Sequence, residues 1–272
     1  MGKNVHYFVA AVSLFVAFLA AQSFGSNSEC ALPPGLFQKR INLESKSSRG
    51  ASDSQSDSTG EDSSTLAAID ERYFQFMEAV SKATSEKDLA RLNNCCRSAA
   101  NDAVARIVCS LAHYLAAGKS EAGSLLGEKQ LSGQEMRALW ALDEIAFRHA
   151  TTSDDHLPNL FKPSGPTALY LDEIYRWAVV GNRAALARYV EIYPHADGEY
   201  AESMDDQWEQ LFGKNTDVVL KNWDLIKLDP KVLQKLQEVV SAETRANIEL
   251  RSKKDCTSYP IACKELLAFA KK

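Results

Sequence analysis

The sequence has no excess of basic residues and none of the short motifs that mark common enzymes. Across 272 residues, 31 Lys and Arg stand against 36 Asp and Glu, giving a formal net charge of −5. Nucleic-acid-binding proteins concentrate positive charge on one face, so this balance argues against a nucleic acid partner. Gly-x-Ser-x-Gly, His-Glu-x-x-His, a phosphate-binding loop and a dinucleotide-binding fingerprint are all missing. We therefore expect no cofactor.

Residues 1–25 have the layout of a secretory signal peptide. A positively charged start precedes an apolar run from Phe8 to Ala21 that only Ser13 interrupts. This run is shorter than the ~20 residues that span a bilayer, so we predict cleavage and no membrane span in the mature chain; an uncleaved anchor is the alternative. No Asn-x-Ser/Thr glycosylation signal occurs, which favours a bacterial periplasm or exterior. The protein is expected to be secreted or periplasmic.

Residues 26–65 are expected to form an N-terminal arm and a Ser/Asp-rich disordered linker. The stretch 45–65 contains nine serines, and its only aliphatic side chain is that of Ala51. Such a composition buries too little apolar surface to offset the entropy lost on ordering. The preceding arm carries a few apolar residues, so it either docks on the body or stays loose.

From residue 66 to residue 272, apolar residues recur every three to four positions, which is the period of an amphipathic helix. Ser132 and Glu135 form a capping box that opens one such helix. Alternating β-branched runs, which mark strands, are absent, and short linkers favour antiparallel packing of consecutive helices. We therefore predict one all-α domain over 66–272, with antiparallel helical hairpins forming an irregular bundle or a short α-solenoid. One stripe comprises Ile69, Tyr73, Phe76, Met77 and Val80.

Two segments repeat an arrangement of aromatic, glycine and asparagine residues. Trp177 precedes Gly181, and Trp208 precedes Gly213, with an asparagine shortly after each glycine. Over roughly 165–240 this pattern resembles α-solenoid helical-repeat proteins in general, although the tetratricopeptide and ankyrin signatures are missing. The resemblance implies a concave face that holds a peptide or protein partner. An irregular bundle whose helices end at glycines is the alternative.

The six cysteines all follow the expected signal peptide, and an even number in an exported chain indicates disulfides. Cys256 and Cys263 flank the turn into the last helix, and we favour this pair. Cys109 can pair with either Cys95 or Cys96 across a helical hairpin, and the remaining cysteine with Cys30. Sequence alone allows 15 pairings.

The alternative to disulfides around residue 100 is a zinc site. Cys109 and His113 lie at i and i+4 on one helix face, and Cys95 and Cys96 would complete the ligand set. Adjacent cysteines are poor ligands for one tetrahedral ion, and Cys-x2-Cys spacing is absent. We therefore expect no metal.

Asp143 lies within the apolar stripe of a helix predicted over 132–149. A carboxylate there requires a partner or a raised pKa. An ion pair with an arginine of another helix would explain it. The alternative is a general acid in an exported helical hydrolase whose cleft holds Asp143, or His149 and His156, but no second carboxylate or nucleophile has a fixed spacing to Asp143. We expect no catalytic residue.

An acidic strip follows Asp197, which suits a helix N-cap. It is expected to be a solvated face, and a basic partner or a weak cation site is the alternative. The strip contains Glu199, Glu202, Asp205, Asp206 and Glu209.

These observations predict an exported, disulfide-linked, helical protein that acts as a protein-binding or scaffold module of the cell envelope or exterior. Trp177, Trp208, Trp223 and Asp143 are the candidate contacts in a groove between helices. The exported hydrolase is the alternative.

Overall fold

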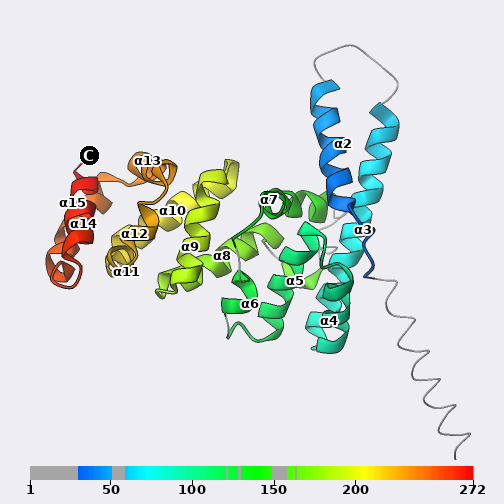
Figure 1. Cartoon of the computed structure of the whole chain (residues 1–272), viewed down its shortest axis with the longest axis horizontal. Coiled ribbons are helices and arrows are strands. Elements are labelled where there is room, and N and C mark those ends of the chain that lie inside the picture. Colours follow the sequence, from blue (N-terminus) through cyan, green and yellow to red (C-terminus); the bar gives the residue numbers. More distant parts are fainter. Residues whose placement is uncertain are drawn as a thin grey trace, which may run out of the picture. The chain divides into compact units, whose positions relative to one another are not determined.

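Helices account for every regular element in the part of the chain that the structure describes (Figure 1). The computed structural model describes residues 30–50, 59–120, 122–127, 130–148, 158–162 and 164–271. It contains α-helices and two short 3-10 helices and, within these ranges, no strand. The predicted all-α class is confirmed. The expected signal peptide lies outside these ranges, and no helix within them is both long and apolar enough to cross a membrane.

The chain divides into two compact units where we expected one domain over 66–272. Unit 1 comprises Met1–Lys119 and Ser132–Pro166, and unit 2 comprises Ser120–Leu131 and Thr167–Lys272. Each unit buries its own set of aromatic and aliphatic side chains. The sequence pattern gives the buried face of each helix but not which helices share a core, so the division could not be read from it.

Unit 1 is built around α3, which contacts every other α-helix of the unit. All five members of the predicted α3 stripe are buried, so that prediction is confirmed. The capping box is also present, because Ser132 N donates to Glu135 Oε2 at 2.8 Å and Glu135 N donates to Ser132 Oγ at 3.2 Å. The helices are α2 Leu36–Gly50, α3 Thr59–Ser85, α4 Leu89–Ser98, α5 Ala103–Ala116, α7 Gly133–Arg148 and the 3-10 helix η2 Asn159–Phe161.

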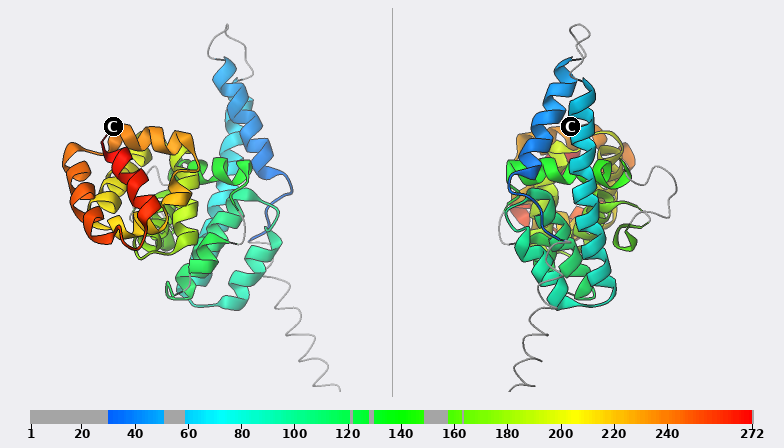
Figure 2. Two further views of the ribbon diagram at one scale, coloured as in Figure 1. Left: turned by 60° about the vertical axis from the view of Figure 1, so that its left-hand side comes forward. Right: turned by 90° about the vertical axis from the view of Figure 1, so that its right-hand side faces the viewer.

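Two helices extend into the serine-rich stretch 45–65. α2 ends at Gly50 and α3 begins at Thr59, so residues 45–50 and 59–65 are helical, and only 51–58 lie outside the described residues. The two helices run side by side (Figure 2). Serine is only moderately unfavourable in a helix, so two well-anchored helices can extend into a serine-rich stretch that composition alone assigns to a linker.

A buried arginine on α2 supplies that anchor. The Arg40 side chain is fully buried, and its Nε donates to Asp70 Oδ1 on α3 at 2.7 Å. Arg40 also pairs with Glu44, and its Nη2 donates to Glu144 on α7 at 3.1 Å. Burial acts to raise the pKa of Glu144, but hydrogen bonds from Arg40 and Arg148 outweigh it and hold that pKa below its usual value. The charged group therefore joins α2, α3 and α7.

Three disulfides pair all six cysteines, so the disulfide prediction is confirmed. Cys30 pairs with Cys95 and Cys96 with Cys109, which settles the choice that the sequence left open around residue 100. Cys256 pairs with Cys263, as we favoured. These bonds use the thiols that the alternative zinc site would have needed, and the described residues contain no other cluster suited to a metal.

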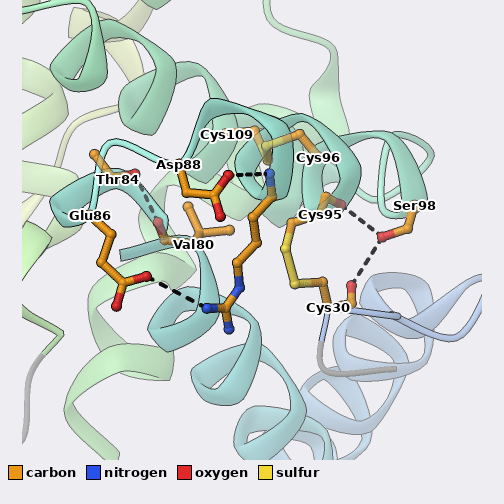
Figure 3. Close-up of a disulfide and its surroundings, with 10 residues drawn as sticks. Cys30, Val80, Thr84, Glu86, Asp88, Cys95, Cys96, Ser98 and Cys109 are labelled. Carbon is orange, nitrogen blue, oxygen red and sulfur yellow. Dashed lines mark hydrogen bonds and ion pairs between the residues drawn. A yellow bond between two sulfur atoms is a disulfide. The ribbon is translucent and has the colours of Figure 1, made fainter. Parts of the chain in front are cut away.

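The adjacent cysteines of α4 bond to different parts of unit 1 (Figure 3). Cys95 reaches Cys30 in the segment before α2, and Cys96 reaches Cys109 in the middle of α5. Ser98 Oγ lies 2.8 Å from the carbonyl oxygen of Cys95 and 3.3 Å from that of Cys30. α4 is therefore cross-linked on two sides.

Unit 2 is a succession of short helices in which α10 contacts α11, α13 and α14, and α14 contacts α15 (Figure 1). The two halves of the sequence repeat differ here. Gly181 follows α8 in a turn at φ +85°, whereas Gly213 lies inside α10. The helices are α6 Ala122–Leu126, α8 Pro166–Val179, α9 Arg183–Ile192, η3 Tyr193–His195, α10 Gly198–Lys214, α11 Thr216–Lys221, α12 Trp223–Ile226, α13 Pro230–Val239, α14 Ala242–Asp255 and α15 Pro260–Ala270.

Aromatic rings form a continuous chain through the core of unit 2. Trp208 stands at its centre, with ring centroids 5.3 Å from Tyr189, 5.6 Å from Tyr193 and 5.8 Å from Phe212. Phe212 in turn stacks on Phe269 of α15 at 5.7 Å. Large aromatic side chains contribute most of the buried apolar area of such a core, and their tilted contacts add to it. These ring contacts link α9, α10 and α15.

The Cys30–Cys95 bond should contribute more stability than the Cys256–Cys263 bond. It closes a separation of 65 residues against 7, and loop-closure entropy gives about 4 kcal/mol for the long loop and about 2.5 kcal/mol for the short one. We expect Cys30→Ala/Cys95→Ala to lower the free energy of unfolding in urea more than Cys256→Ala/Cys263→Ala does. The reverse order would contradict this account.

Trp208→Ala should lower the free energy of unfolding by about 3–5 kcal/mol, because it removes a fully buried indole and leaves a cavity. Val180→Ala is the control: that side chain is 70% exposed, and its loss should change stability by less than about 0.5 kcal/mol. Urea unfolding followed by circular dichroism measures both. If Trp208→Ala lowered the free energy of unfolding no more than the control does, the ring contacts around Trp208 would not be what stabilises unit 2.

Candidate functional site

The three candidate tryptophans occupy different environments. Trp208 and Trp223 are 0% and 3% exposed, so both rings belong to the core of unit 2 rather than to a binding surface. Trp177, on α8, is half-buried. Trp208 and Trp223 were both candidate contacts in a groove between helices, and both rings are covered by neighbouring side chains.

Trp177 forms a small surface on α8 together with an arginine and a valine. The Arg176 guanidinium lies over the Trp177 ring, 5.3 Å from its centroid. Arg176 Nε also donates to Glu173 Oε2 at 2.8 Å, one turn earlier on the same helix. Val180, three residues after Trp177 and directly after the end of α8, is 70% exposed. We call Arg176, Trp177 and Val180 the α8 surface.

Two features limit the motion of the side chains of the α8 surface. Glu173 is buried, so its ion pair fixes the direction of the Arg176 side chain. Stacking of a guanidinium on an indole face limits the rotamers of both side chains. Trp and Arg side chains with restricted motion lose less entropy on association and are enriched among residues that dominate binding energy.

A glutamine joins α10 to α8 and α9 near this surface. Gln207 Oε1 accepts from the Tyr189 hydroxyl at 2.7 Å, and Gln207 Nε2 donates to Asp172 Oδ1 at 3.0 Å. The Tyr175 hydroxyl donates to the Gln207 carbonyl at 3.0 Å. Burial raises the pKa of Asp172 and raises the pKa of Tyr175 to about 12. These groups position α8 against its neighbours.

The acidic strip of α10 divides into two groups. Asp205 accepts from the Tyr193 hydroxyl at 2.7 Å, and Glu209 accepts from Ser241 N at the start of α14, so both hold helices together. Glu199, Glu202 and Asp206 are exposed. Asp197 stands at the N-cap of α10, as predicted, although its side chain makes no capping hydrogen bond.

Asp143 belongs to unit 1, whereas all three tryptophans belong to unit 2, so the candidate contacts do not share one unit. Its side chain is buried on α7 and lies against Gly165, where a Cβ atom would come within 2.7 Å of Asp143 Oδ1. Gly165 has a φ of +86°, so both its backbone and this close approach require glycine. His149 and His156, the other residues of the hydrolase alternative, lie outside the described residues.

Neither Arg176 nor Gln207 was among the residues predicted from the sequence to contact a partner. For Arg176, the only indication in the sequence is its position next to Trp177. This indication does not predict a contact, because consecutive residues of a helix need not share a face. Nothing in the sequence separates Gln207 from other polar residues of α10, since its partners come from two other helices.

The chain matches no protein-family model, and neither the curated proteins nor the solved structures contain a significant match to it.

Tyr175 should make the protein lose stability at high pH. Its pKa is raised to about 12 in the folded chain, while an unfolded tyrosine titrates at about 10. The folded state holds this proton more tightly, so the contribution is complete below the unfolded pKa and is lost as pH rises through the folded pKa. Tyr175→Phe should therefore reduce the fall in the urea midpoint between about pH 10 and about pH 12. An unchanged pH dependence would contradict this.

Proposed function

We propose that the protein is an exported protein-binding or scaffold module of the cell envelope or exterior, and that it contacts its protein or peptide partner through the α8 surface. The observation that carries the proposal is the Arg176 guanidinium stacked on the half-buried Trp177 ring beside the exposed Val180. Arginine and tryptophan are enriched among the residues that dominate the energetics of protein–protein association.

Two lines support export. Three disulfides pair all the cysteines, and such bonds persist in oxidising compartments. Residues 1–25 also have the layout of a signal peptide. Because cytosolic thiols are kept reduced, the two lines together favour a place outside the cytosol.

The support beneath the α8 surface favours binding without a large rearrangement. Tyr175 on α8 packs its ring 5.6 Å from Tyr189 on α9, and Gln207 on α10 bonds to both helices. A surface on packed helices keeps its shape on association, so less free energy is lost in ordering its side chains and backbone. This is the property expected of a binding module or a scaffold.

A photo-cross-linking residue at position 180 tests the proposal in the producing cell. Incorporation of p-benzoylphenylalanine for Val180 should give one discrete cross-linked product, and adding Trp177→Ala should reduce it by about tenfold or more, the loss expected for a residue that dominates binding. Leu250→Ala is the matched control, because Leu250 is also exposed, at 69%, and lies far from α8 in the sequence.

Circular dichroism checks that each variant keeps its helices. Absence of a discrete product at position 180, or a product that Trp177→Ala leaves unchanged, would contradict the proposal. The same cross-linker placed at position 250 should give no such product.

A further inference from the structure

The three disulfides differ in the surroundings of their sulfur atoms. Cys30 and Cys95 are both buried, at 2% and 3% exposure. Cys96 and Cys256 are half-buried, and each is bonded to a buried cysteine. Two of the three bonds therefore have one partly exposed cysteine, and this is the side from which we expect a thiol in solution to approach.

When a thiolate attacks the partly exposed cysteine, the buried cysteine of the pair is released. This released cysteine is Cys109 in one bond and Cys263 in the other, and the two have different surroundings. Cys109 lies in the middle of α5, which spans Ala103–Ala116. Cys263 is the fourth residue of α15, a helix of 11 residues, and its N–H donates to the Tyr259 carbonyl in the first hydrogen bond of that helix. A helix N-terminus stabilises a nearby thiolate, and a more stable leaving thiolate speeds disulfide exchange.

α15 is held in unit 2 by contacts that do not involve its disulfide. Leu266 is fully buried, and Phe269 lies 5.7 Å from the rings of both Phe212 and Trp223. Lys227 Nζ pairs with Glu265 Oε2 at 2.8 Å on the surface. The bond between Cys256 and Cys263 can therefore open while α15 remains docked.

We propose that Cys256–Cys263 is a reversible thiol–disulfide exchange site, which takes low-molecular-weight thiols or a thiol of another protein. This activity goes beyond the proposed partner binding and uses no residue of the α8 surface. Cys256 is the sulfur attacked, and Cys263 is the sulfur that leaves.

The exchange is balanced by two thiols. A thiolate attacks Sγ of Cys256, the bond to Cys263 breaks, and its electron pair passes to Sγ of Cys263, which takes up a proton. A second thiolate then attacks the sulfur of the first thiol in the mixed disulfide and releases Cys256, which is protonated in turn. The two thiols become one disulfide, and the cysteine pair gains two electrons and two protons.

Timed reduction of the full folded chain with glutathione tests the site. Aliquots are quenched with acid, alkylated and mapped by peptide mass spectrometry. We expect Cys256 and Cys263 to become alkylated about tenfold faster than Cys96 and Cys109, and Cys30 and Cys95 to react last. The Cys96–Cys109 bond is the internal control, because it also has one half-buried sulfur but no helix N-terminus beside its partner.

The helical circular dichroism signal should stay unchanged while the Cys256–Cys263 bond opens. Adding oxidised glutathione should form that bond again. Cys256→Ala/Cys263→Ala should abolish the fast phase and leave the other two bonds intact. Equal rates at the two half-buried bonds, loss of helical signal with the first bond, or failure of the bond to close again would each overturn the proposal.

Discussion

The covalent pairing of the cysteines is the constraint on which unit 1 depends most. α4 has only ten residues and buries only Leu92 and Cys95, so its own packing is small. Short helices are marginal in water unless other contacts hold them. The bonds from Cys95 to Cys30 and from Cys96 to Cys109 supply those contacts, and they also fix the segment before α2 and the middle of α5. The two bonds therefore hold α4 between the segment before α2 and α5.

Unit 2 is stabilised instead by contacts between aromatic rings and by an arginine that donates hydrogen bonds to carbonyls at the ends of two helices. The chain of aromatic side chains around Trp208 fills its core. Arg245 donates to the carbonyls of Gln237 and Val240 at the end of α13 and to that of Phe269 near the end of α15. Carbonyls in the last turn of a helix lack an N–H partner four residues on, and here a long cationic side chain from a neighbouring helix donates to them. Short helices can therefore stack closely.

The features predicted correctly from the sequence are those determined by residues close together along the chain. The α3 stripe, the Ser132–Glu135 capping box and the pairing of Cys256 with Cys263 each follow from spacing along one segment. Sequence-based prediction failed where the cause lies between segments. Arg40 anchors α2 through Asp70 on α3, 30 residues away, and this contact overrides the serine-rich composition. Trp177 and Trp208 carry the same local pattern, and only their neighbouring helices decide that one is half-buried and the other is core.

The most direct test of the account is a count of free thiols in the unreduced protein. The chain purified without reductant is unfolded in the presence of a maleimide, and its peptides are mapped by mass spectrometry. The account predicts no maleimide on any of the six cysteines. Maleimide on Cys30, Cys95, Cys96 and Cys109 would contradict both the cross-linking of α4 and the placement of this protein outside the cytosol.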